Sequence, residues 1–205
     1  MTIGLGLRAQ KGGAVAVAVV IRNGEPHVVL STVIATHAPD DRCALEPYRV
    51  AYDMVHREGG TLTDAAVAVA QGRARQDRLA EEGLQEVVRT LASANDGPVV
   101  AALLVNRAGW ITDLLGHSLA WAEHVPVAEG LAVRDALRAG LRASDIETVE
   151  LDEKSLTDLA AEKLGLPPVE IDTRLKALGV TAGKPWRKEQ KAACLAAWIA
   201  ATARR

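Results

Sequence analysis

Three short apolar runs at the start of the chain constrain its fold more than any other feature. They read "TIGLGLR" (2–8), "AVAVAVVIR" (14–22) and "PHVVLSTVIA" (26–35), with "AQKGG" and "NGE" between them. Gly-Gly and Asn-Gly dipeptides between such runs are typical of β-hairpin turns. The pattern predicts an antiparallel meander of three strands. Because the runs are almost unbroken in their apolarity, we expect both faces of this sheet to be covered.

The glycines within "GLGLRAQKGG" (4–13) raise the question of a phosphate-binding loop. A dinucleotide loop requires G-x-G-x-x-G at the start of a helix, but here Gly4 and Gly6 are followed by Ala9 and then by another strand. A Walker loop requires Gly-Lys-Ser/Thr, but Lys11 precedes two glycines. Neither template fits, so the stretch predicts a hairpin turn.

Helical and strand patterns alternate along the rest of the chain. The spacing of apolar residues, together with Pro, Gly and capping signals, predicts each element. A pattern from about 63 to 94 is interrupted by Gly72 and Gly83, which leaves one or two helices open. "PVVAALLVN" (98–106) has the length and apolarity of a central parallel strand. The other predicted elements are helices at 47–58, 111–122, about 131–143, 155–164, 169–178 and 185–202, a short apolar segment at 124–130, and a strand at 146–151.

The composition fits a globular protein with one substantial core. Of the 205 residues, 49% are apolar and 24% are charged, and Phe is absent, so Ala, Val, Leu and Ile must build the core. We expect a single domain over 1–205 with a helical C-terminal region from about 155 to 205. The net charge of −2 provides no overall attraction to nucleic acid or to an anionic membrane.

The cysteines and the hydropathy pattern point to a cytoplasmic protein. Cys43 and Cys194 lie far apart without metal-ligand spacing, which favours reduced thiols. The apolar N-terminus is interrupted by Arg8, Gln10 and Lys11, and no later run reaches the roughly 18 apolar residues that span a bilayer. We therefore expect no membrane partner.

The order of elements resembles the ribonuclease H-like superfamily, and its Holliday-junction resolvase branch more than its sugar-kinase and actin branch. The resemblance covers most of the chain and rests on the first hairpin, on "PVVAALLVN" as fourth strand, on "AEGLAVRDALRAGLRASDIETVEL" as a helix leading into the fifth strand, and on "KEQKAACLAAWIA" as closing helix. It implies an α/β fold, with three antiparallel hairpin strands plus parallel strands in one mixed sheet flanked by helices. Two of these segments also resemble bacterial members of the superfamily without an assigned activity.

The same resemblance implies where catalytic acids should lie. Nucleases of this superfamily hold divalent metals with carboxylates on the first strand, near the fourth strand and on the closing helix. In this chain the first strand and "PVVAALLVN" carry no acid, and the closing helix offers Glu189 with Lys191 nearby. We therefore expect a catalytically inactive member that uses no metal or other cofactor.

Two groups of residues remain as candidates for a catalytic or ligand-binding site. Glu129, preceded by His124 and directly before a predicted helix, occupies roughly the place of the superfamily's second carboxylate, although the helix dipole alone also favours a Glu there. Glu46 and Tyr48, with His37, follow the third strand and are candidates for ligand binding; helix capping explains them as well.

A third candidate is a basic segment at the start of the closing helix. An aromatic residue among cations can contact phosphates, but a solvated helix face gives the same pattern. Arg204 and Arg205 end the chain. The basic segment consists of Lys184, Trp186, Arg187, Lys188 and Lys191.

The leading hypothesis is a binding or assembly module that self-associates or engages a protein partner, with phosphate-backbone binding to nucleic acid as one version. The alternative is a divergent nuclease or phosphotransferase that acts on nucleic acid with Mg²⁺. It would use Glu129, Glu189 and a nearby acid such as Asp113 or Asp135.

Overall fold

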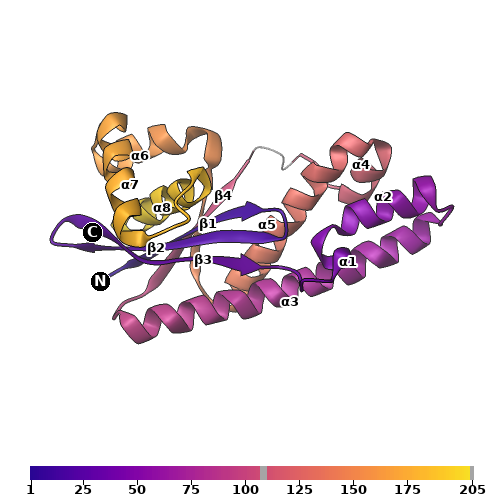
Figure 1. The fold of residues 1–205 in the computed structure, drawn as a ribbon, viewed down its shortest axis with the longest axis horizontal. Coiled ribbons are helices and arrows are strands. Elements are labelled where there is room, and N and C mark those ends of the chain that lie inside the picture. Colours follow the sequence, from indigo (N-terminus) through magenta and orange to yellow (C-terminus); the bar gives the residue numbers. More distant parts are fainter. Residues whose placement is uncertain (107–109, 204–205) are drawn as a thin grey trace.

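The computed structural model describes residues 1–106 and 110–203. Its centre is one five-stranded sheet with the strand order β3-β2-β1-β4-β5 (Figure 1). The first three strands pair antiparallel, whereas β4 pairs parallel with β1, and β5 pairs parallel with β4. The mixed sheet predicted from the sequence is confirmed. The strands are β1 (Ile3–Gln10), β2 (Gly13–Arg22), β3 (Glu25–Ala35), β4 (Val99–Val105) and β5 (Glu147–Asp152).

The glycine-rich stretch forms a hairpin turn, as predicted. Gly12 has φ of +72°, and β2 follows it directly, so no helix opens here. In the second turn Asn23 and Gly24 both have positive φ, at 52° and 84°. A two-residue turn with both φ values positive matches the right-handed twist of the paired strands. These turns set the register of the meander.

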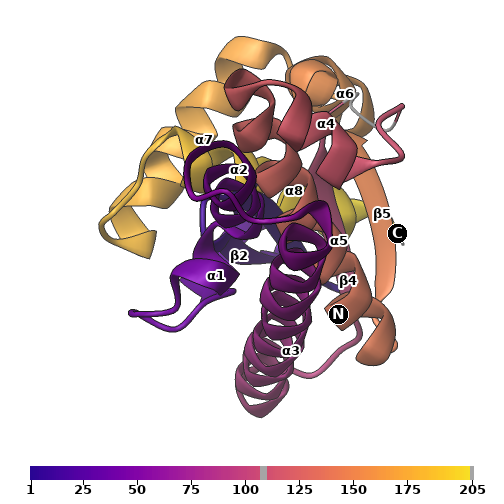
Figure 2. The ribbon, with the colours of Figure 1, turned by 90° about the vertical axis from the view of Figure 1, so that its right-hand side faces the viewer.

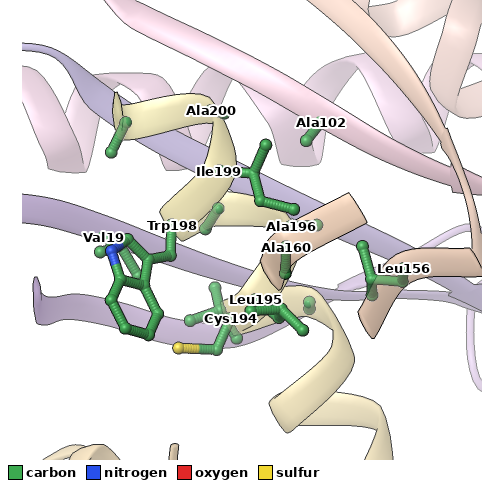
Figure 3. Close-up of a cluster of buried hydrophobic side chains, with 14 of the residues drawn as sticks. Val19, Ala102, Leu156, Ala160, Cys194, Leu195, Ala196, Trp198, Ile199 and Ala200 are labelled. Carbon is green, nitrogen blue, oxygen red and sulfur yellow. The ribbon is translucent and has the colours of Figure 1, made fainter. Parts of the chain in front are cut away.

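Three C-terminal helices cover one face of the sheet. They are α6 (Leu156–Leu164), α7 (Pro168–Ala182) and α8 (Lys188–Thr202), and α8 lies directly on β1, β2 and β4. Gly4 and Gly6 allow this approach, since a Cβ at either position would overlap a backbone carbonyl of α8. Figure 3 shows Val19, Ala102 and Trp198 in the core between α8 and the sheet. The small side chains of α8 thus bring its backbone close to β1.

Two long helices cover the opposite face. They are α3 (Leu62–Ala94) and α5 (Val125–Ala143), and their Leu84, Leu91 and Leu137 pack against Leu5 and Leu103 of the strands. Each of these leucines is at most 1% exposed. Full burial of a Leu stabilises the fold by roughly 1.5 to 3 kcal/mol. Both faces of the sheet are therefore buried, in agreement with the unbroken apolar runs.

A group of short helices extends the molecule beyond the carboxyl end of β1. It consists of α1 (Arg42–Leu45), α2 (Pro47–Arg57) and α4 (Leu114–Ala120), together with the N-terminal parts of α3 and α5 (Figures 1 and 2). Tyr48, Val69 and Val125 belong to a separate small core here. Single 3-10 turns, η1 (Ala122–His124) and η2 (Glu153–Ser155), precede α5 and α6.

The structure corrects several predicted boundaries. The pattern at 63–94 is one helix, because Gly72 lets α3 approach the backbone of Cys43, and Gly83 lets it approach the side chain of Ile34. The segment at 124–130 is not separate, since α5 begins at Val125. The final helix begins at Lys188 rather than at Pro185. In the part of the chain described here, no helix has the length and hydropathy to cross a bilayer.

Candidate functional site

Arg8 lies at the end of β1, on the face that packs against α8. Gly4, Gly6 and Arg8 alternate along the strand, and the two glycines contact α8, so the arginine emerges just past that contact. Its Nε donates a hydrogen bond of 2.8 Å to Oε1 of Glu153. Its Nη1 lies 4.0 Å from Oε1 of Glu189 on α8. A cation therefore occupies the end of the first strand and pairs with two acids.

A second guanidinium lies beside the end of β4. Nη1 of Arg134, on α5, donates to Oδ1 of Asn106 at 3.0 Å. The Nε of Arg134 is buried and has no hydrogen-bond partner among the described residues. Burial lowers the pKa of Arg134, and the charges of Arg138 and Arg8 lower it further, whereas Glu153 opposes the shift. This edge of the sheet is rich in arginine.

The donor set at this edge does not fit a divalent metal. Within 1–106 and 110–203, no three His, Cys, Asp or Glu side chains are grouped so that they could hold an ion. Mg²⁺ and Mn²⁺ prefer carboxylate and water oxygens. Here Arg8 lies beside the two acids, Glu153 and Glu189, and neutralises them.

Glu129 caps the N-terminus of α2. The prediction that it precedes a helix is wrong, because it lies within the first turns of α5. Its Oε1 accepts hydrogen bonds from the backbone N–H groups of Tyr48 and Arg49, at 2.8 and 2.9 Å. These groups follow Pro47, and the Glu46 side chain makes no capping bond to them. Glu129 supplies the missing cap from another helix.

The surroundings of Glu129 raise its affinity for a proton. Burial raises the pKa of Glu129 to about 7; the two backbone N–H groups oppose this shift, and the charge of Glu46 adds to it. Oε2 of Glu129 is buried without a partner among the described residues. Lys11 pairs with Glu46 at 2.8 Å, and all three side chains line a cavity of about 250 Å³. The carboxyl group can thus hold or release a proton near neutral pH.

Two groups predicted separately come together here. Glu129 and the Glu46–Tyr48 segment meet at the start of α2, 81 residues apart in the chain at their hydrogen bond. The Tyr48 ring is buried, and its hydroxyl accepts a hydrogen bond of 3.4 Å from Arg73. Burial raises the pKa of Tyr48. Ligand binding by Glu46 and Tyr48 stays a prediction.

His124, the last residue of η1, belongs to an aromatic cluster beside α4. Its ring stacks on the ring of His117, with centroids 4.0 Å apart and an interplanar angle of 3°. Trp110 meets His117 edge-on, with centroids 5.8 Å apart. These contacts assign His124 a packing role and leave its catalytic role a prediction.

The basic segment surrounds the N-terminus of α8. Lys184, Arg187 and Lys188 are exposed, and Lys191 is half-buried. The indole N–H of Trp186 donates to the carbonyl of Leu175 at 2.9 Å, and its ring packs on Gly179 of α7. Trp186 therefore packs the basic segment against α7, and this packing occupies the ring that would otherwise stack on a nucleic-acid base. The predicted cations Arg204 and Arg205 lie outside the described residues.

One groove joins the basic segment to Arg8. Arg8, Arg187 and Glu189 line a cavity of about 490 Å³ beside the start of α8. The sequence interpretation overlooked Arg8, although it is the one charged residue in the run 2–8. Gly4, Gly6 and Arg8 are each two residues apart, so a strand places them on the same face. This spacing was the signal in the sequence that Arg8 lies on the face of the two glycines.

The layout of sheet and helices defines a ribonuclease H-like α/β fold, the class expected from the sequence. Two solved structures align with this chain, and the first of them supports the fold assignment. "T. thermophilus RuvC in complex with Holliday junction substrate" aligns with a TM-score of 0.50 at 8% identity, over 97% of this chain and 92% of that one. "Thermus thermophilus RuvC structure" aligns with a TM-score of 0.46 at 7% identity, over 96% and 92%. No protein-family model matches the sequence, and no curated protein matches it.

Proposed function

We propose that this chain is a non-catalytic ribonuclease H-like protein that binds its ligand at the carboxyl ends of β1 and β4. The observation that carries the proposal is the position of Arg8. The superfamily's nucleases place an acid on the first strand, where this chain has an arginine paired with Glu153 and Glu189. The end of β4 carries Asn106 instead of an acid. Among the described residues on β1, at the end of β4 and on α8, Glu189 is the one carboxylate.

Electrostatics support this proposal. Two unit charges 4 Å apart interact by about 4 kcal/mol at an effective dielectric constant of 20. Nη1 of Arg8 is 4.0 Å from Glu189 Oε1, so the guanidinium repels a cation that approaches this carboxylate and lowers its affinity for one. The guanidinium also satisfies the acids that a metal would need.

The alternative function, a metal-dependent nuclease or phosphotransferase, would need Glu129 and either Asp113 or Asp135 as metal ligands. In the structure these three carboxylates make hydrogen bonds or ion pairs within the protein. Glu129 caps α2, and Asp113 accepts a hydrogen bond from the backbone N–H of Gly116 at the start of α4. Asp135 pairs with Arg73 and Arg138, at 3.1 and 2.9 Å. These contacts explain the acids without catalysis.

Nucleic acid is the ligand of this proposal to test first. The similar RuvC structure is in complex with a Holliday junction, and the groove at α8 carries Arg8 and Arg187 beside exposed Lys184 and Lys188. Such cations contact phosphates without reading bases. We also predict, as alternatives to nucleic acid, that the same module binds a protein partner or associates with a second copy of this chain.

The metal test separates binding from catalysis. We expect millimolar Mg²⁺ or Mn²⁺ to leave the melting temperature unchanged and branched DNA uncut. Cleavage that requires the metal and is lost in Glu189→Gln would overturn the proposal. Arg8→Asp serves as the matched variant, because removal of the guanidinium and addition of a carboxylate should let the ions stabilise the protein.

The DNA test uses the salt dependence of binding. We expect affinity for a four-way junction to fall linearly with the logarithm of salt concentration. Replacing both Lys188 and Lys191 with Gln should reduce the slope by about 2, since each phosphate-contacting Lys contributes about 1. The exposed Lys163 on α6, replaced with Gln, is the control. Absence of binding at low salt would exclude the nucleic-acid version.

A further inference from the structure

A polar cavity of about 490 Å³ lies past the carboxyl end of β4, between the sheet and the short helices. Val105 and Asn106, at the end of β4, and residues 111–115, at and before the start of α4, line the cavity. α3 and α5 contribute three arginines, Arg73, Arg134 and Arg138. The cavity is separate from the groove beside α8 that Arg8 and Arg187 line.

Two of the three arginines have carboxylate partners. Arg73 donates to Asp135 at 3.1 Å and to the Tyr48 hydroxyl at 3.4 Å. Arg138 donates to both oxygens of Glu150 and, at 2.9 Å, to Asp135. Asp135 and Glu150 are thereby neutralised. The third acid that lines the cavity, Asp113, accepts the N-cap hydrogen bond from the backbone N–H of Gly116 at the start of α4.

Arg134 differs from both. Its hydrogen bond to a side chain of the described residues goes to Asn106, a neutral acceptor, and no carboxylate oxygen of those residues lies within 4.0 Å of it. Its Nε is buried without a partner in the same part of the chain. A guanidinium has five N–H donors, and Arg134 is a half-buried cation whose carboxylate neighbours, Glu153 and Asp135, act on it only at a distance, so its charge is incompletely compensated. The structure therefore leaves a positive charge in the cavity with donors to spare.

We propose that this cavity binds the oxyanion group of a small molecule, a phosphate or a carboxylate, through Arg134. A planar guanidinium pairs with such groups through two parallel hydrogen bonds, and Arg134 retains the donors for them. The cavity exceeds the size of inorganic phosphate, which leaves room for an organic part against Ile111, Leu115 and Leu131. Ligands in α/β proteins commonly sit beyond the carboxyl ends of adjacent parallel strands, as this cavity does at β4.

Inorganic phosphate and citrate are the two probes, each titrated at constant ionic strength with chloride as reference. We expect at least one of them to raise the melting temperature saturably, and the comparison shows whether the site prefers phosphate or carboxylate. Arg134→Gln should weaken the apparent affinity at least tenfold. Arg89→Gln, on the exposed face of α3, is the matched control and should bind as the wild type does.

A second measurement keeps the test valid if the Arg134 variant folds poorly. In wild-type protein, the Nε–Hε NMR resonance of Arg134 should shift on addition of the anion that stabilises, while that of Arg89 should stay in place. Equal stabilisation by chloride, or equal binding by Arg134→Gln, would overturn the proposal. Its failure is distinct from failure of the proposed function, because metal-dependent cleavage would refute the latter and leave this anion site untouched.

Discussion

Glu129 should make the stability of this protein fall as the pH rises from mildly acidic to neutral. Its carboxyl group is buried, one oxygen caps α2, and the other has no partner among the described residues. In the folded protein its pKa is about 7, against 4.5 as the ordinary value. Between these pH values the folded state holds a proton that the unfolded state has released.

The sign and size of the effect follow from proton linkage. Because the folded state binds more protons in this window, the free energy of unfolding decreases with pH. The stabilisation is complete below the unfolded pKa and is lost as the pH rises through the folded pKa. One pKa unit corresponds to about 1.4 kcal/mol, so a shift from 4.5 to about 7 amounts to roughly 3 kcal/mol.

Glu129→Gln tests this reasoning directly. The amide keeps an oxygen for the Tyr48 and Arg49 N–H groups but has no proton to release. Urea unfolding at about pH 5 should give similar stabilities for variant and wild type, whereas at about pH 8 the variant should be more stable by roughly 3 kcal/mol. The exposed Glu86→Gln on α3 is the control. If the free energy of unfolding depended on pH in the same way for wild type and Glu129→Gln, the proton would not be bound by Glu129 and the reasoning would be refuted.

The remaining predictions concern packing and access. Gly6→Ala should lower stability by about 3 kcal/mol, because the added methyl overlaps the α8 backbone, while Gly130→Ala on α5 should raise it by about 0.5 to 1 kcal/mol; thermal unfolding that ranks them otherwise would contradict the close β1–α8 packing. Burial raises the pKa of the Cys194 thiol to about 12, so a thiol reagent followed by mass spectrometry should modify the partly exposed Cys43 in the folded protein and Cys194 after unfolding. Trp186→Phe should cost about 1 kcal/mol through loss of its indole hydrogen bond and leave the affinity for DNA unchanged; a loss of affinity with an unchanged salt slope would assign the indole to the ligand instead.

The sequence was most informative where structure depends on near neighbours. The Asn-Gly turn at 23–24 and the helix start at Pro47 were predicted from residues a few positions apart, and the structure confirms them. The Thr61–Asp64 capping box of α3 has the same local origin. The unbroken apolar runs likewise predicted a sheet covered on both faces. Such features follow from backbone sterics and local hydrogen bonds, which a short segment already contains.

The candidate site depends on contacts that no local pattern specifies. Arg8 meets Glu153 across 145 residues, and the Glu129 carboxylate meets the N–H of Tyr48 across 81. Glu129 was noted as an acid before a helix, but its role as a cap for a different helix depends on how α2 and α5 pack.

The sequence by itself determined the strands, most of the helices, the covering of both faces of the sheet and the lack of acids on the first and fourth strands. The tertiary structure alone decided which charges meet: Arg8 between two acids, Arg134 without a carboxylate among the described residues, and Glu129 buried against the start of α2. The physical reason is that burial and ion pairing depend on distances of a few ångströms between segments remote in the chain, whereas secondary structure depends on neighbours along it.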